Sequence, residues 1–183
     1  MSSKKIAVLF SGTGTNFEYL AKNQDGYEIV VALSNNPNAG GIEIAKRYGI
    51  ESIVIDSKLY DSREEFDSKI VEVLSGYELD LVVLAGFMRI LTPIFTNAFR
   101  AINLHPSLLP RHKGLHAIQK SYSDEYDEGG VSVHWVSSQL DSGEMILQQA
   151  ISKQNLSLDE YTQQIKTIEK QALLEALKKI LEI

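Results

Sequence analysis

Two patterns of apolar and polar positions alternate along the first hundred residues. Short runs in which nearly every residue is apolar predict strands that are buried on both faces. These runs cover residues 4–10, 28–34, 51–55, 79–87 and 100–104. Between them, apolar residues at helical spacing predict helices over 16–22 and 42–48, and a longer one that Asp61 or Ser62 caps. Buried strands joined by helices predict a mostly parallel sheet with helices on both faces.

The pattern changes after about residue 128. The strands predicted over 130–136 and 144–151 are separated by residues 137–143, a gap too short for a helix. They are therefore expected to form an antiparallel hairpin. Residues 157–160 match the capping-box pattern S-x-x-E and begin a long C-terminal helix. The predicted fold class is α/β, an open Rossmann-like sheet that is mostly parallel and ends in an antiparallel hairpin and a long C-terminal helix.

Composition narrows the class of protein. The chain has 183 residues, of which 44% are hydrophobic, and this suits one domain with a sizeable core. The net charge of −6 argues against a nucleic-acid partner, and the absence of cysteine excludes disulfides and thiolate zinc sites. The longest apolar stretch is well below the roughly 18 residues of a membrane span. We expect a soluble, cytoplasmic protein without a membrane partner.

Ligands of open α/β sheets bind beyond the carboxyl ends of the strands, so the residues after each strand are the candidate ligand contacts. SGTGTN (11–16) follows the first strand and resembles a dinucleotide-binding loop, but Phe17 stands where its third glycine belongs. The second strand also ends without an acidic residue for a ribose hydroxyl. Backbone amides at the following helix favour a phosphate monoester, with a ligand-free tight turn as the alternative.

Asn103 and His105 stand two residues apart at the end of the fifth strand, and Pro106 ends that strand. Residues two apart in a strand point to the same side, so both side chains are expected to emerge together at the ligand edge. Two convergent donors can stabilise an oxyanion during acyl transfer. Asp141, in the hairpin connection, could orient and charge His105, or could serve only as a turn residue.

Three other features have plainer interpretations. GFMRIL (86–91) could line a flat aromatic pocket, but ordinary core packing with Arg89 reaching water is the more economical explanation. His112 and His116 have the spacing of helical metal ligands, but Gly114 between them suits a loop, so no metal site is predicted. His134 alternates with Val133 and Trp135 on a strand and is interpreted as structural.

Several segments together resemble the folate-dependent phosphoribosylglycinamide formyltransferases, nearly from end to end. The segments are SGTGTN, LAGFMRIL, INLHPSLLPRHKGLHA, GVSVHWVSSQLDSGEMILQ and IEKQALLEAL. The resemblance implies that the catalytic residues are Asn103, His105 and Asp141. It implies that the ribonucleotide is bound by Gly14, Thr15, Asn16, Arg63 and Glu169. It implies that the folate is bound by Met88, Arg89, Ile90, Leu91, Asn103, Ser138 and Asp141, under the loop 137–141.

The resemblance also implies the reaction. The formyl group of 10-formyltetrahydrofolate is transferred directly to the amine of glycinamide ribonucleotide, in purine biosynthesis, without a metal. The whole chain, residues 1–183, is then one formyltransferase domain. Its half at about 1–100 binds the ribonucleotide phosphate, and its half at about 101–183 carries catalysis and folate binding. The expected partners are small molecules, and a homodimer is left open. Thr13, Thr15 and Lys113 depart from the usual family residues, which we interpret as tuning of loop rigidity.

Other functions remain as alternatives at this point. A formyltetrahydrofolate hydrolase would use the same trio to transfer the formyl group to water, but it carries an extra amino-terminal domain, and here a strand begins at residue 4. A methionyl-tRNA formyltransferase adds an RNA-binding domain, which the acidic charge does not suit. A non-enzymatic nucleotide-binding module would give no reason for Asn103, His105 and Asp141 to coincide.

Overall fold

Parallel strands form the framework of the first of two units into which the chain divides. The computed structural model describes residues 3–183; the first unit ends at Asn103 and includes Ile183, and the second is Leu104–Glu182. The strands are β1 (Lys4–Phe10), β2 (Tyr27–Ser34), β3 (Ser52–Val54), β4 (Leu81–Leu84) and β5 (Ala101–His105), whose first residues belong to this unit. Hydrogen bonds join them in the order β3-β2-β1-β4-β5. Strand order therefore reverses between β1 and β4, where ligand crevices form in such sheets.

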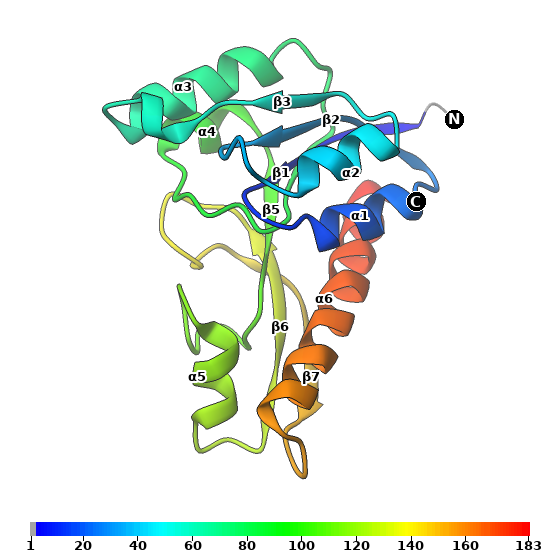
Figure 1. Ribbon diagram of the computed structural model, residues 1–183, viewed down its shortest axis with the longest axis vertical. Helices are drawn as coiled ribbons and strands as arrows, with labels where there is room; N and C mark the ends of the chain where they lie inside the picture. The colour runs from blue at the N-terminus through cyan, green and yellow to red at the C-terminus, as the bar shows by residue number, and fades with distance from the viewer. Residues whose placement is uncertain (1–2) are drawn as a thin grey trace. The chain divides into compact units, whose positions relative to one another are not determined.

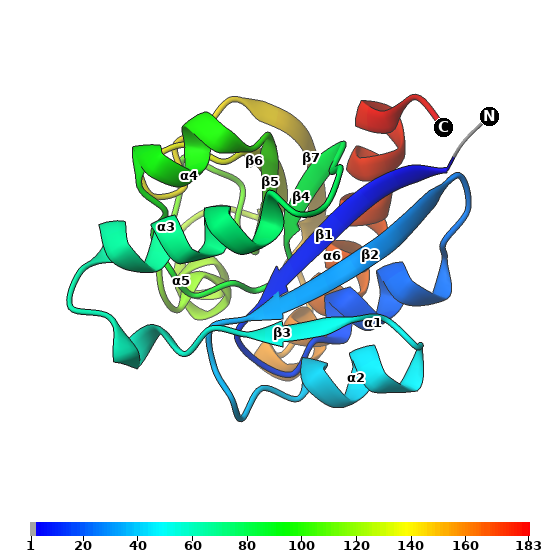
Figure 2. The ribbon, with the colours of Figure 1, turned by 90° about the horizontal axis from the view of Figure 1, so that it is seen from above.

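The helices of the first unit cover both faces of this sheet, as predicted. They are α1 (Thr15–Lys22), α2 (Gly41–Arg47), α3 (Arg63–Leu74) and α4 (Pro93–Ala98), with a short 3₁₀ helix η1 (Ser57–Leu59) before α3. Figure 2 shows α1 and α2 on one face and α3 and α4 on the other. The predicted cap of α3 is Ser62, whose hydroxyl accepts the Glu65 N–H at 3.1 Å. Phe66, Ile70 and Leu74 bury the apolar stripe of α3.

Two predictions for this unit were wrong in detail. The fourth strand was expected over 79–87 but covers only Leu81–Leu84, because the chain turns at Gly86, whose φ is 80°. Helix α4 was not predicted at all. It has six residues and begins with Pro93 at its first turn, so it is too short to show a helical period.

The second unit is a hairpin with helices (Figure 1). Strands β6 (Glu128–Trp135) and β7 (Met145–Ser152) pair antiparallel, from Glu128 opposite Ser152 to His134 opposite Met145. The long helix α6 (Leu158–Leu181) packs along both strands, and both bonds of its predicted capping box are present between Ser157 and Glu160. Helix α5 (Ala117–Ser123) was not predicted. Among residues 3–183, no helix is apolar over a stretch long enough to cross a membrane.

Candidate active site

His105 and Asp141 form a buried pair in the second unit. His105 is the last residue of β5, and Pro106 follows it, as the sequence predicted. Its Nδ1 lies 3.3 Å from Oδ2 of Asp141, and the two side chains are only 8% and 5% exposed. Water is largely excluded from the pair, so the attraction between a carboxylate and an imidazolium is stronger here than at the surface.

A close backbone approach brings Asp141 to this position. After β6 the chain folds back so tightly that a Cβ on Gly143 would lie 1.6 Å from the carbonyl oxygen of Trp135. Only glycine fits there. Trp135 N–H also donates to the carbonyl of Glu144 at 2.9 Å, which fixes the connection across the strand ends. Asp141 itself has a φ of 45°, a left-handed conformation that aspartate tolerates better than most residues.

His134 also contacts the candidate catalytic carboxylate. Its Nε2 lies 3.7 Å from Oδ1 of Asp141, and its Nδ1 is 2.9 Å from the carbonyl oxygen of Trp135. The sequence interpretation gave His134 a structural place only and missed this contact. A signal was present: Ser132 and His134 are polar residues two apart on a strand that is otherwise apolar and buried.

The surroundings of Asp141 keep it ionised. Burial acts to raise the pKa of this carboxyl, but the bonds from His134 and from the Gly114 N–H, which donates to Oδ2 at 2.9 Å, together with the charge of His105, lower the pKa below its ordinary value. At neutral pH Asp141 is therefore a carboxylate that faces two imidazole rings. Such a carboxylate can orient His105 and stabilise its protonated form.

The second ring nitrogen of His105 is bound to the backbone. Nε2 lies 2.8 Å from the carbonyl oxygen of His112, in the loop before α5. The imidazole of His112 binds Asp124, with Nε2 2.6 Å from Oδ2, so the side-chain partner of His112 in the structure is Asp124 and not His116. Residues 3–183 hold no cluster of three His, Cys, Asp or Glu side chains placed for a metal ion.

The loop after β1 lies in the first unit at the strand-order reversal. Ser11 N–H donates to the Gly86 carbonyl at 3.0 Å, and Ser11 Oγ accepts the Met88 N–H at 2.7 Å, so this loop is tied to the segment after β4. Asn16, in the first turn of α1, has a buried Oδ1 without a hydrogen-bond partner among the described residues. A buried acceptor without a donor is costly, and a ligand hydroxyl or amine would satisfy it.

The packing of its loop requires glycine at position 14. Its φ is 77°, and a Cβ there would lie 2.7 Å from the Cα of Gly41 at the start of α2. We therefore expect Gly14→Ala to lower the free energy of unfolding by about 1–3 kcal/mol, measured by urea denaturation. Gly12→Ala is the matched control, because a Cβ on Gly12 would meet nothing within 4 Å. Equal stability of the two variants would contradict this packing argument.

The segment assigned to folate, residues 88–91, is only partly exposed. Met88 is 68% exposed and Ile90 is also exposed, so two apolar side chains lie open to a ligand. Leu91 is 2% exposed and belongs to the core. Arg89 does not simply extend into water, because its guanidinium lies 5.2 Å from the ring centre of Phe66 on α3.

The other predicted residues are distributed over both units. Asn103 lies on β5, where its Cα is paired with that of Leu84 in β4. Arg63 is the exposed first residue of α3. Glu169 is half-buried on α6, and Ser138 is exposed in the connection between β6 and β7. The structure thus brings His105 and Asp141 into contact. The roles of all the predicted site residues, these two included, stay predictions.

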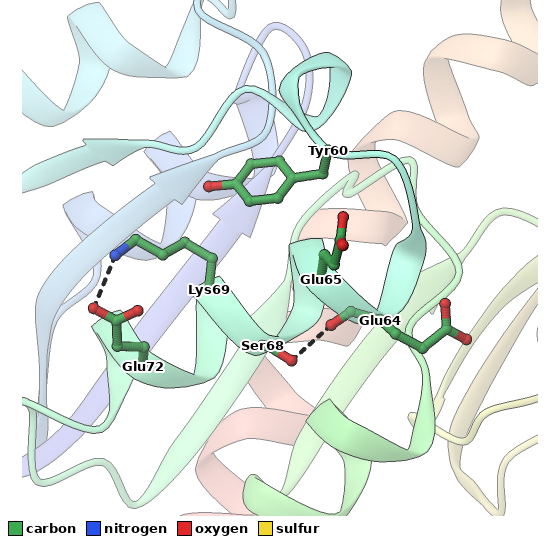
Figure 3. Close-up of a pocket in the computed structure, with 6 residues that line it drawn as sticks. All are labelled: Tyr60, Glu64, Glu65, Ser68, Lys69 and Glu72. Atoms are coloured by element: carbon green, nitrogen blue, oxygen red, sulfur yellow. Dashed lines mark hydrogen bonds and ion pairs between the residues drawn. The ribbon is translucent and has the colours of Figure 1, made fainter.

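A separate pocket of about 400 Å³ opens on the surface of α3 and contains none of the predicted site residues (Figure 3). Its lining is acidic, and Lys69 within it is paired with Glu72 at 2.8 Å. The six lining residues are Tyr60, Glu64, Glu65, Ser68, Lys69 and Glu72. A folate or phosphate carries negative charge, so this lining does not suit the ligands expected here.

Comparison with known proteins decides the family. The family model described as formyl transferase matches residues 4–177. The chain belongs to the formyl transferase family. The chain is similar to a phosphoribosylglycinamide formyltransferase of Campylobacter jejuni with a known crystal structure. The two sequences are 46% identical, and the structures superpose with a TM-score of 0.94 over 98% of each chain. This likeness confirms the predicted fold class and the family resemblance.

Relatives of two sizes occur in this formyl transferase family. The phosphoribosylglycinamide formyltransferase of Escherichia coli (strain K12) is 39% identical over 149 residues, which are 78% of this chain and 70% of that protein. The trifunctional purine biosynthetic protein adenosine-3 of Gallus gallus is 39% identical over 180 residues. The chain spans only 18% of the length of that chicken protein and 15% of the human one.

Proposed function

We propose that this formyl transferase transfers the formyl group of 10-formyltetrahydrofolate to the amine of glycinamide ribonucleotide, as a step of purine biosynthesis. The single observation that carries the proposal is the buried pair of His105 and Asp141 at the end of β5, with Nδ1 3.3 Å from Oδ2. The names of the Campylobacter and Escherichia relatives support it. The proposed ligands are small molecules and the proposed compartment is the cytoplasm.

In the proposed reaction, the amine attacks the formyl carbon on N10 of the folate and gives a tetrahedral intermediate with negative charge on the formyl oxygen. Protonated His105 and the amide of Asn103 donate hydrogen bonds to that oxygen. The bond between the formyl carbon and N10 then breaks, and the proton lost by the amine passes to N10, so that tetrahydrofolate leaves. Asp141 stays ionised because its pKa is lowered, and it stabilises the charge on His105 throughout. Holding the amine and the formyl group together makes the step effectively unimolecular.

We assign binding of the two substrates to the segments at the strand-order reversal and on α6. The phosphate is assigned to the amides of Gly14, Thr15 and Asn16, where α1 begins, with Arg63 and Glu169 as further contacts. The folate is assigned to the exposed apolar side chains of residues 88–90, with the connection 137–141 as its cover. Ser11, in the loop that leads to residues 14–16, is bonded to Gly86 and Met88, and this supports a fixed geometry between these two segments of the first unit.

The test mixes the protein with 10-formyltetrahydrofolate, with and without glycinamide ribonucleotide, and follows tetrahydrofolate by absorbance. Release that requires the ribonucleotide, with formylglycinamide ribonucleotide as product, is expected. Equal release without the ribonucleotide would instead identify a hydrolase that transfers the formyl group to water. No release under either condition would contradict any formyl transfer from this folate.

A further inference from the structure

The hydrogen bonding of His105 distinguishes its two ring nitrogens. Nε2 lies 2.8 Å from the carbonyl oxygen of His112, and a carbonyl only accepts, so Nε2 carries a hydrogen. Nδ1 faces Oδ2 of Asp141 at the longer distance of 3.3 Å. A backbone bond at one imidazole nitrogen commonly selects the tautomer and leaves the other nitrogen for chemistry. In this chain Nε2 faces a backbone carbonyl at the shorter distance, and Nδ1 faces the carboxylate.

The carbonyl that anchors Nε2 is itself held in place. His112 has a φ of 54°, a left-handed conformation that is strained for most residues and needs support. One support is Ser107, whose hydroxyl donates to the neighbouring carbonyl of Arg111 at 2.5 Å. The other is Asp124, whose Oδ2 lies 2.6 Å from Nε2 of the His112 ring. The side chain of Asp124 is thus bonded to the residue whose carbonyl anchors His105.

The carboxylate of Asp124 is itself fixed by several hydrogen bonds and ion pairs. Lys153, at the end of β7, places Nζ 2.5 Å from Oδ1 and also donates to the carbonyl of Ser121 at 2.7 Å. Arg111 lies 3.6 Å from Oδ2, and the Tyr126 N–H donates at 3.1 Å. Burial opposes the charge of Asp124, but the bonds from Lys153, from His112 and from the Tyr126 N–H lower its pKa to about 2. The carboxylate is thus ionised throughout the neutral range.

We propose that Asp124 and His112 are positioning residues for His105. Asp124 holds the His112 ring, the His112 carbonyl accepts Nε2–H of His105, and the ring is thereby fixed with Nδ1 toward Asp141. That a ring fixed in this way serves formyl transfer rests on the proposed function, whereas the anchoring of the ring does not. The five residues that these contacts connect all belong to the second unit; they are Lys153, Asp124, His112, His105 and Asp141.

The charged and titratable groups that face this chain of contacts come from several elements. Asp141 faces His105 from the hairpin connection, and His134 on β6 lies behind it. Lys153 and Arg111 face Asp124 beside the His112 ring. A change in the pH profile of kcat can therefore be assigned to Asp124 or His112 only in variants that alter one of these residues and leave the pair of His105 and Asp141 in place.

Two variants break the support at different points. Asp124→Asn keeps the size of the side chain and removes the charge. His112→Asn removes the imidazole bridge, keeps a residue that tolerates the φ of 54°, and leaves Asp124 with Lys153. Asp127→Asn is the matched control, because it removes an equal charge from an exposed position in the same segment. Thermal unfolding of each variant establishes that it is folded before it is compared.

The primary readout is the ¹⁵N spectrum of the His105 ring in the unliganded protein, followed by the pH profile of kcat. We expect neutral His105 in the wild type and in Asp127→Asn to carry its hydrogen on Nε2. In both Asp124→Asn and His112→Asn a Nδ1–H population is expected, with kcat lowered about tenfold and the ribonucleotide KM within about twofold. The pH profile of kcat should shift in these two variants and stay unchanged in the control.

The opposite results overturn the proposal. A wild-type His105 whose neutral form carries its hydrogen on Nδ1 would show that the His112 carbonyl does not anchor it. Folded Asp124→Asn and His112→Asn proteins with the wild-type tautomer and pH profile would show that these residues do not position it. A wild-type protein that transfers no formyl group would contradict the proposed function alone, since the nitrogen spectra would still decide the anchoring.

Discussion

Replacing His105 by alanine is expected to lower kcat for formyl transfer about 100- to 1000-fold, the usual cost of one lost donor to a developing oxyanion. His105 stands two residues after Asn103 on β5, and its Nδ1 lies 3.3 Å from the Asp141 carboxylate, which can stabilise the protonated ring. The loss should fall on turnover, because the donor acts most strongly when the formyl oxygen gains charge. Steady-state kinetics with both substrates measure it.

Binding of the ribonucleotide is the internal control for this variant. The loop assigned to the phosphate, residues 14–16, lies in the first unit, whereas His105 lies in the second. Affinity for glycinamide ribonucleotide, measured by calorimetry, should therefore stay within about threefold of the wild type, well under 1 kcal/mol. A loss of affinity that equals the loss of turnover would show that His105 binds substrate and has no special part in the transition state.

The fold was largely predictable because its strands differ from their surroundings. A strand buried on both faces is an unbroken apolar run, and β1, β2 and β5 were all predicted to within one residue at each end. The two helices that were missed, α4 and α5, have six and seven residues. Fewer than two full turns give no helical period, so tertiary packing decides their conformation.

The candidate site was predictable only where neighbours in sequence are neighbours in space. The spacing of Asn103 and His105 on one strand predicts a convergent pair, and that convergence stays a prediction. Asp141 reaches His105 through the tight fold at Gly143, which sequence spacing alone does not indicate. The residues alone therefore left Asp141 as either a partner of His105 or a turn residue, and the family resemblance favoured the partner. The His112 carbonyl was missed because a backbone group leaves no mark in the sequence. The contact of His134 with Asp141 was missed because a polar residue on a buried strand has many structural uses.

Asp141→Asn is expected to lower kcat about 100- to 1000-fold as well, although the side chain keeps its size. The amide oxygen can still accept the Gly114 N–H, so the connection should stay folded. What is lost is the charge that faces His105 and His134. Without it, protonated His105 has no compensating carboxylate in a site that excludes water, and its donation to the oxyanion weakens.

The pH dependence of this deficit tests the role of the charge. The folded-state pKa of Asp141 is lowered below the ordinary value of 3.8, so the wild-type carboxylate is ionised at every pH above that value. The difference in kcat between wild type and Asp141→Asn should therefore persist at neutral and alkaline pH, and should shrink only as the pH falls through the lowered pKa, where the wild type is protonated too. Glu144→Gln, which alters an exposed carboxylate in the same connection, should match the wild type. Turnover of Asp141→Asn within about tenfold of the wild type at neutral pH would mean that its position, and not its charge, is what His105 requires.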